Sequence, residues 1–171
     1  MSVISFRVYQ PLVLALTLAL IVLYSGTLTS VADGQSLQVT NAEANNSVVM
    51  NKMVKLTNSI RAEHNLPPMV ASYSLEKSAK VKVNDMIEKQ YFSHYDPSGD
   101  SFSKIVWDQK PDAQMVGENI AKCFTSPEAA FDGFVKSPAH FGILVGDFTS
   151  IGVASQTRSD GCELIVLHVS R

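Results

Sequence analysis

The chain has 171 residues, of which 46% are hydrophobic, and its 14 basic and 16 acidic residues give a net charge of −2. A weakly acidic chain without a run of like charges has no electrostatic reason to bind nucleic acid or acidic lipid, so we expect no nucleic-acid partner. The sequence also contains no Walker loop, dinucleotide fingerprint or internal repeat, which argues against the nucleotide-binding and repeat classes of protein.

Residues 1–32 have the layout of an export segment. Arg7 is their only charge, and residues 12–23 form an uncharged apolar run. A basic region before about a dozen apolar residues is typical of a secretory signal peptide, and Ser30-Val31-Ala32 supplies the small residues that a signal peptidase reads. Extended over residues 11–28, the run reaches about 17–18 residues and would instead serve as an uncleaved membrane anchor. Either interpretation places the rest of the chain outside the cytoplasm, secreted or held on the outer face of the membrane, with membrane contact only through this segment.

A change of composition follows the export segment. Residues 33–47 are rich in Gln, Asn, Ser, Thr and Ala and have few large apolar side chains, which predicts a flexible linker. Asn45-Asn46-Ser47 is a glycosylation sequon, which matters if the cell is eukaryotic. Residues 48–171 are long enough for one folded domain of ordinary size.

The first half of this domain is predicted to be helical. Apolar residues recur three or four positions apart and form one stripe of a helix, namely Val49, Met53, Leu56 and Ile60. Leu66-Pro67-Pro68 ends that helix, and a second helix is expected over residues 73–90. Asp96-Pro97-Ser98-Gly99 predicts a turn, and a short helix over residues 103–107 follows it.

Strands are predicted in the second half, after further helix starts. Ser126-Pro127 and Ser137-Pro138 each combine a capping hydroxyl with a proline at the first helical position. Strands are expected over residues 115–123, 149–157 and 162–169, the last two joined by a hairpin-type loop. Helices segregated from a small antiparallel sheet predict an α+β layered domain.

The chain contains two cysteines, Cys123 and Cys162. Outside the cytoplasm an isolated pair favours a disulfide over two free thiols. The bridge would close a loop of about 40 residues, which is worth about 4 kcal/mol on a chain-entropy model. The alternative is two buried, reduced cysteines that do not meet.

Five segments carry a family resemblance. They are Asn58-Ser59-Ile60-Arg61 with Leu66-Pro67-Pro68, Tyr91-Phe92-Ser93-His94, Gly117-Glu118-Asn119-Ile120, Ser137-Pro138-Ala139-His140 and Ser150-Ile151-Gly152-Val153-Ala154. In this order the segments resemble the CAP superfamily, which includes cysteine-rich secretory proteins, antigen 5 and plant pathogenesis-related proteins, and in particular its bacterial-type single-domain members. The resemblance covers about residues 50–169, and it implies a three-layer α-β-α sandwich with a three-stranded antiparallel sheet flanked by helices.

The resemblance also implies a surface cleft lined by two histidines and one or two glutamates. His94 and His140 match the histidines, and Glu118 matches the first glutamate. Longer eukaryotic members carry a second glutamate three residues after an aromatic residue. Here Phe134 is followed at that spacing by Ser137, so the two-glutamate arrangement is incomplete.

Three kinds of chemistry fit such a cleft. Neutral imidazoles of His94 and His140 would hold a zinc ion, with Glu118 as a third ligand or as the base for a bound water. Without a metal, a histidine and Glu118 would form an acid–base pair. In a structural interpretation, Glu118 accepts hydrogen bonds and the two histidines pin a helix to the sheet. His168, which alternates with Val166 and Leu164, is expected to be a partly buried strand residue.

These alternatives define the function classes. The first is a non-catalytic, extracytoplasmic binding module for lipid, sterol, metal or a partner protein. The second is a metal-dependent or acid–base hydrolase of extracellular peptide or envelope polymer that uses His94, Glu118 and His140. The third is a structural module of the envelope. The missing second glutamate favours the binding module over the enzyme.

Overall fold

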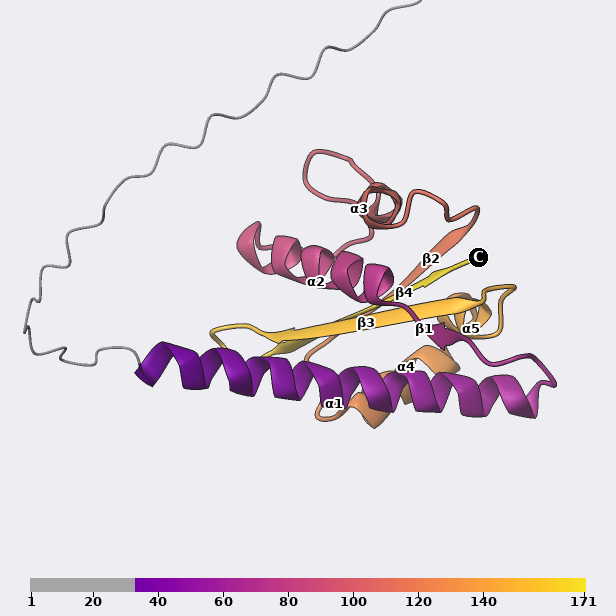
Figure 1. Ribbon diagram of the computed structural model, residues 1–171, viewed down its shortest axis with the longest axis horizontal. Coiled ribbons are helices and arrows are strands. Elements are labelled where there is room, and N and C mark those ends of the chain that lie inside the picture. The colour runs from indigo at the N-terminus through magenta and orange to yellow at the C-terminus, as the bar shows by residue number, and fades with distance from the viewer. Residues whose placement is uncertain (1–32) are drawn as a thin grey trace, which may run out of the picture. The chain divides into compact units, whose positions relative to one another are not determined.

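The computed structural model describes residues 33–171 (Figure 1). The predicted signal peptide or anchor over residues 1–32 lies outside these residues. No helix within the described part combines the length and the hydropathy that a membrane crossing requires.

The described residues form an α+β domain with five helices and a four-stranded mixed sheet. In chain order the elements are α1 (Asp33–Glu63), β1 (Val70–Ala71), α2 (Tyr73–Glu88), α3 (Phe102–Gln109), β2 (Val116–Lys122), α4 (Pro127–Lys136), α5 (Pro138–Leu144), β3 (Ser150–Thr157) and β4 (Glu163–Ser170). The strand order across the sheet is β1-β3-β4-β2.

The sheet corrects the prediction of three antiparallel strands. β3 pairs antiparallel with β4, and β4 pairs antiparallel with β2, which accounts for the three predicted strands. The two-residue β1 adds a fourth strand, parallel to β3, through Val70 opposite Ser150 and Ala71 opposite Ile151. A two-residue strand is too short to show alternation, so the sequence pattern carried no signal for it.

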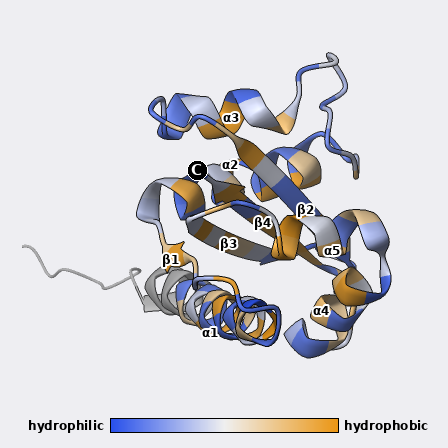
Figure 2. Ribbon diagram, turned by 90° about the vertical axis from the view of Figure 1, so that its right-hand side faces the viewer, coloured by the Kyte–Doolittle hydropathy of each residue, from blue (hydrophilic) through white to orange (hydrophobic). Residues whose placement is uncertain are grey.

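Helices cover both faces of the sheet (Figure 2). On β4, Ile165, Leu167 and Val169 belong to a core with α1, α4 and α5. The alternate residues Leu164 and Val166 pack with α2 on the opposite face. Because successive side chains of a strand point to opposite faces, β4 is apolar on both sides and lies at the centre of the domain.

The range 33–47, expected to be a flexible linker, is helical in the structure as the first half of α1. In Figure 1 this helix runs alongside β3. The Asn46 side chain accepts a hydrogen bond from the Ser155 main-chain N–H at 2.8 Å and donates to Glu76 at 3.3 Å. The amide oxygen of Asn46 thus takes the place of a strand partner at the edge of β3. Asn46 therefore connects α1 to both β3 and α2.

Cys123 and Cys162 form a disulfide, with their Cα atoms 4.6 Å apart. Cys123 follows the last residue of β2, and Cys162 precedes the first residue of β4. The bridge therefore joins two neighbouring strands at one end of their shared ladder.

Arg61, near the end of α1, is buried and holds three segments together. Its guanidinium donates to the main-chain oxygens of Pro67 at 2.8 Å, Leu144 at 3.1 Å, Gly146 at 2.8 Å and Phe148 at 3.1 Å. Burial lowers the pKa of Arg61, while the negative charge of Asp147 acts in the opposite direction. The side chain links the end of α1, the loop before β1 and the segment between α5 and β3.

We expect the variant Arg61→Leu to lose about 3 kcal/mol or more of unfolding free energy, because four carbonyl groups, two of them in buried bonds, lose the guanidinium donor. Denaturant titration of the variant and the wild type measures this loss. Arg158→Leu is the matched control: its exposed partner is Asp160, and such a pair is worth at most about 1 kcal/mol. Equal losses in the two variants would contradict the role given to Arg61.

Candidate functional site

Glu118 on β2 is the centre of a buried polar cluster. Its side chain is 0% exposed and lies between two imidazoles. His94 Nδ1 is 2.7 Å from one carboxylate oxygen, and His168 Nε2 is 2.9 Å from the other. His94 comes from the loop after α2 and its side chain is 43% exposed, whereas the His168 side chain is fully buried. Each oxygen of Glu118 therefore has an imidazole partner.

The strand register brings Glu118 and His168 together. The two residues are direct cross-strand partners in the antiparallel β2–β4 pair, so their side chains emerge on the same face of the sheet. This is the face covered by α2. His168 is a strand residue as predicted, but its burial is complete rather than partial, and its ring is hydrogen-bonded to Glu118.

The cluster continues from His168 into α2. His168 Nδ1 lies 2.7 Å from the Ser78 hydroxyl, which donates to the Leu75 carbonyl at 2.8 Å. A hydroxyl has one proton, so Ser78 cannot donate to Leu75 and to His168 at once. His168 is thus held through both ring nitrogens, by the Ser78 hydroxyl on one side and by Glu118 on the other.

The environment of Glu118 favours its charged form. Burial alone would raise the pKa of this carboxyl group. Hydrogen bonds from His168 and His94, together with the positive charge of Lys82, outweigh burial and hold the pKa of Glu118 below its ordinary value. Glu118 is therefore a carboxylate at neutral pH.

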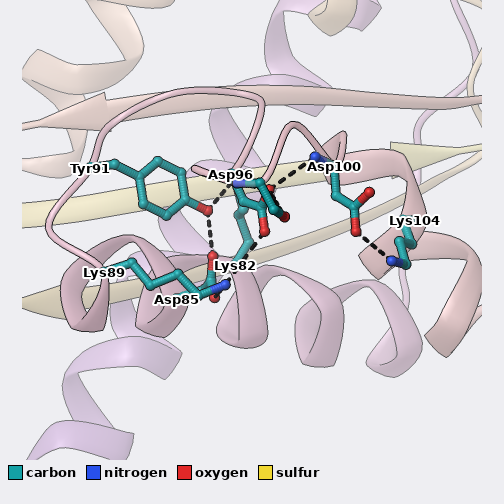
Figure 3. A network of polar contacts seen from close by, with 8 residues as sticks. Lys82, Asp85, Lys89, Tyr91, Asp96, Asp100 and Lys104 are labelled. Atoms are coloured by element: carbon teal, nitrogen blue, oxygen red, sulfur yellow. Dashed lines mark hydrogen bonds and ion pairs between the residues drawn. The ribbon is translucent and has the colours of Figure 1, made fainter.

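A second polar network lies next to this cluster and positions the segment that carries His94 (Figure 3). Lys82, fully buried in α2, donates to the Tyr91 hydroxyl at 3.0 Å, and Tyr91 donates to Asp85 at 2.5 Å. Burial raises the pKa of Tyr91, and its hydrogen bond to Asp85 raises it further. Lys89 lies between Asp85 and Asp96 in the figure and forms ion pairs with both. These bonds fix the chain on either side of His94.

Asp96 organises the turn that follows His94. One of its oxygens accepts hydrogen bonds from the Ser98 hydroxyl, the Ser98 main-chain N–H and the Asp100 main-chain N–H. These bonds, led by that of the Ser98 hydroxyl, depress the pKa of Asp96. The turn predicted over residues 96–99 is present, and its geometry comes from the aspartate side chain.

His140, at the start of α5, lies apart from the Glu118 cluster. Its ring makes no hydrogen bond to His94 or Glu118 within the described residues, and it packs against Phe134 at 5.4 Å between ring centroids. Burial lowers the pKa of His140, and the positive charge of His94 lowers it further. His94 is thus hydrogen-bonded to Glu118, whereas His140 is not. His140 interacts with His94 only through the electrostatic effect on its pKa.

A groove of about 210 Å³ lies beside His140. Its lining comes from β2, α4, α5 and the segments next to them, and consists of Phe92, Ile120, Ala121, Lys122, Phe124, Gly133, Phe134 and His140. We call this the His140 groove. Most of its lining is aromatic or aliphatic.

Comparison with known proteins matches residues 54–169 to the family described as CAP: Cysteine-rich secretory protein family. The chain belongs to this family. The uncharacterized protein YkwD of Bacillus subtilis strain 168 is 36% identical over 115 residues, which are 67% of this chain and 45% of YkwD. The uncharacterized membrane protein YlbC of the same organism is 32% identical over 103 residues, 60% of this chain and 30% of YlbC. The chain spans less than half the length of either relative.

Solved structures have the same CAP fold. An extracellular protein containing a SCP domain, from Bacillus anthracis strain Ames, superposes with a TM-score of 0.69 at 28% identity, over 86% of this chain and 45% of that chain. An outer surface protein from Borrelia burgdorferi superposes with a TM-score of 0.63 over 82% of this chain and 96% of that one. At 16% identity the second likeness supports the fold alone.

The predicted metal site of this CAP domain has few free ligand atoms. Among residues 33–171, no group of three or more His, Cys, Asp or Glu side chains is arranged to hold a metal ion. Both oxygens of Glu118 are engaged by imidazoles. Of the predicted site residues, the imidazole nitrogens that remain near the surface are Nε2 of His94 and those of His140.

We expect Glu118→Gln to lose about 3–5 kcal/mol of unfolding free energy at neutral pH, because the buried imidazole of His168 loses its anionic partner. The control is Glu128→Gln, whose ion pair with Lys52 is solvent-exposed. That variant should change stability by at most about 1 kcal/mol. Thermal or denaturant unfolding measures both, and a small loss in Glu118→Gln would contradict a structural role for the cluster.

The lowered pKa of Glu118 also predicts how the unfolding free energy of these two variants depends on pH. The pKa of Glu118 is lower in the folded chain than in the unfolded chain, where it is about 4.3. The stability that its charge contributes is therefore complete above the unfolded value, and it is lost as the pH falls through the folded value. Unfolding free energy measured between neutral pH and pH values below about 4 should fall less steeply for Glu118→Gln than for Glu128→Gln or the wild type. Parallel curves would argue against a charged Glu118.

Proposed function

We propose that this CAP domain acts outside the cytoplasm as a non-catalytic binding module whose ligand occupies the His140 groove. The observation that carries the proposal is the state of Glu118. Its side chain is fully buried, and both of its oxygens accept from imidazoles. A general base or a metal ligand needs an oxygen that substrate, water or metal can reach, and Glu118 offers none.

The His140 groove supports binding of a ligand with an apolar part. Small-molecule and peptide sites are mostly apolar, with a few polar groups that fix orientation. Here the aromatic rings of Phe92, Phe124 and Phe134 supply the apolar surface, and Lys122 and His140 supply the polar groups. A lipid or sterol, or an apolar side chain of a partner protein, meets these requirements.

Location outside the cytoplasm is supported by two independent observations. The Cys123–Cys162 disulfide fits an oxidising compartment. Similar proteins are described as an extracellular protein and as a membrane protein. The domain is secreted or anchored at the outer face of the membrane through residues 11–28, and it has no nucleic-acid partner.

The alternative function is hydrolysis of extracellular peptide or envelope polymer. One observation favours it: the half-exposed imidazole of His94 is oriented by the carboxylate of Glu118, and this arrangement of a base held by a third group is common in catalytic sites. Turnover of either substrate by the full chain, lost in His94→Gln and kept in His64→Gln, would establish the alternative and refute the binding module.

The groove is tested with an anilinonaphthalene sulfonate dye, whose fluorescence rises in apolar surroundings. Phe124 is exposed and lines the groove, so Phe124→Ser should weaken dye binding by about fivefold or more. Tyr73, which is also exposed but lies outside the groove lining, gives the control Tyr73→Ser, with unchanged affinity. Equal affinities of the two variants would show that the dye binds elsewhere and would remove the support for the groove.

A zinc titration tests the metal part of the proposal. Two imidazoles, His94 through Nε2 and His140, are the ligands on offer, with Glu118 orienting His94 from behind. We expect weak binding that disappears in His140→Ala and persists in the control His64→Ala, measured by calorimetry. Because the pKa of His140 is lowered, its imidazole stays neutral, and able to bind zinc, to a lower pH than an ordinary histidine does. Equal heats in the two variants would mean that His140 does not bind zinc, and a structural role for the histidines would remain.

A further inference from the structure

The outer edge of β2 carries no neighbouring strand within the described chain. β2 is the last strand in the order β1-β3-β4-β2 and pairs only with β4. At one end of this ladder Met115 and Arg171 exchange main-chain hydrogen bonds, and at the other end the Cys123 N–H donates to Glu163. In an antiparallel pair, residues that bond the partner alternate with residues that face away. The main-chain groups of Glu118, Ile120 and Lys122 therefore point to the outer edge.

These outward groups are available for bonding. No hydrogen bond from another element of the described chain reaches the main chain of Glu118, Ile120 or Lys122. The Glu118 side chain is 0% exposed, while the whole residue is 5% exposed, so the part that solvent reaches is its backbone. A row of unpaired N–H and C=O groups on an edge strand is a template for another strand.

The His140 groove straddles this same edge. Ile120, Ala121 and Lys122 of β2 form its floor, Phe92 approaches from the segment after α2, and Phe134 and His140 approach from α4 and α5. Side chains of an added strand would point alternately to the two sides of the edge. An apolar side chain on one side would then enter the groove.

The charges around the edge favour an acidic group in the ligand. A second cavity, of about 500 Å³, shares Phe92 and Lys122 with the groove and adds Arg158. Neither cavity has an Asp or Glu in its lining. The Lys122 ammonium lies over the Phe92 ring at 4.7 Å and forms no ion pair within the described residues.

We propose that the outer edge of β2 binds an extended peptide segment of a partner protein as an added strand. An apolar side chain of that segment fills the His140 groove, and an acidic side chain meets Lys122. The inference rests on the proposed binding function and names its ligand class. A lipid or sterol would fill the groove but would leave the row of main-chain donors and acceptors unpaired, whereas a peptide backbone satisfies both.

The test uses a labelled synthetic peptide of sequence Glu-Thr-Val-Thr-Val-Thr, blocked at both ends, and the full chain. A matched peptide carries N-methyl groups on alternate residues, which keeps the side chains and removes the bonding N–H groups. We expect the first peptide to bind, and the N-methylated peptide to bind about tenfold or more weakly. Fluorescence anisotropy measures both affinities, and hydrogen exchange should show new protection of the Ile120 and Lys122 amides.

Two variants test whether the positive charge of Lys122 contributes to peptide binding. Lys122→Glu should weaken the peptide by about fivefold or more, while Lys77→Glu, an exposed lysine of α2, should leave the affinity unchanged. Equal binding of the two peptides, or no binding of either while the dye still binds the groove, overturns strand addition and leaves the proposed function standing. If the dye also fails to bind the groove, both strand addition and the proposed binding function are refuted. The chain could also associate with itself as its concentration rises, with the β2 amides protected from hydrogen exchange before peptide is added. That result would assign the edge to a second copy of the chain and overturn a peptide partner.

Discussion

The buried carboxylate of Glu118 needs hydrogen-bond donors and positive charge close to it, and this requirement determines how the sheet, α2 and the loop after α2 pack together. Removing an ion from water costs several kcal/mol, which only charge and well-placed donors offset. His168 of β4 and His94 of the loop after α2 donate to Glu118 of β2, and the Ser78 hydroxyl of α2 holds the other ring nitrogen of His168. Each donor is held at a distance below 3 Å, so the sheet, the helix and the loop have one arrangement that satisfies them all.

The sequence located part of this arrangement well. The family segments contain His94 and Glu118, and their contact was predictable as a convergence of motif residues. His168 lies outside those segments, and its role depends on the register between two strands. The cysteine pair indicates which ends of β2 and β4 meet, but it fixes the register only to within one residue. Because a slip of one residue turns the side chain of His168 to the other face, the pairing alone does not predict the contact with Glu118.

Other features depended on partners that local sequence does not reveal. The strand β1 exists because the edge of β3 accepts two residues, and Asn46 of α1 bonds the same edge further along. Neither β1 nor the start of α1 shows a hydrophobic period of its own. Lys82 and Arg61 are buried, which is rare for residues of their types. Lys82 is held by Tyr91, and Arg61 is held by four main-chain oxygens. Whether a long polar side chain is buried depends on partners that are distant in the sequence, and hydrophobic periodicity does not predict such partners.

The disulfide also makes the two ends of the β2–β4 ladder unequal. At Cys123 the strands are tied covalently, while at Met115 they are held by main-chain bonds to Arg171 alone. Thermal fraying in such a ladder begins at the untied end and closes again from the tied end. The stretch from Ile120 to Lys122, next to the tie, therefore keeps its register during the brief openings that reach Val116, and the surface it presents is the most persistent part of the strand.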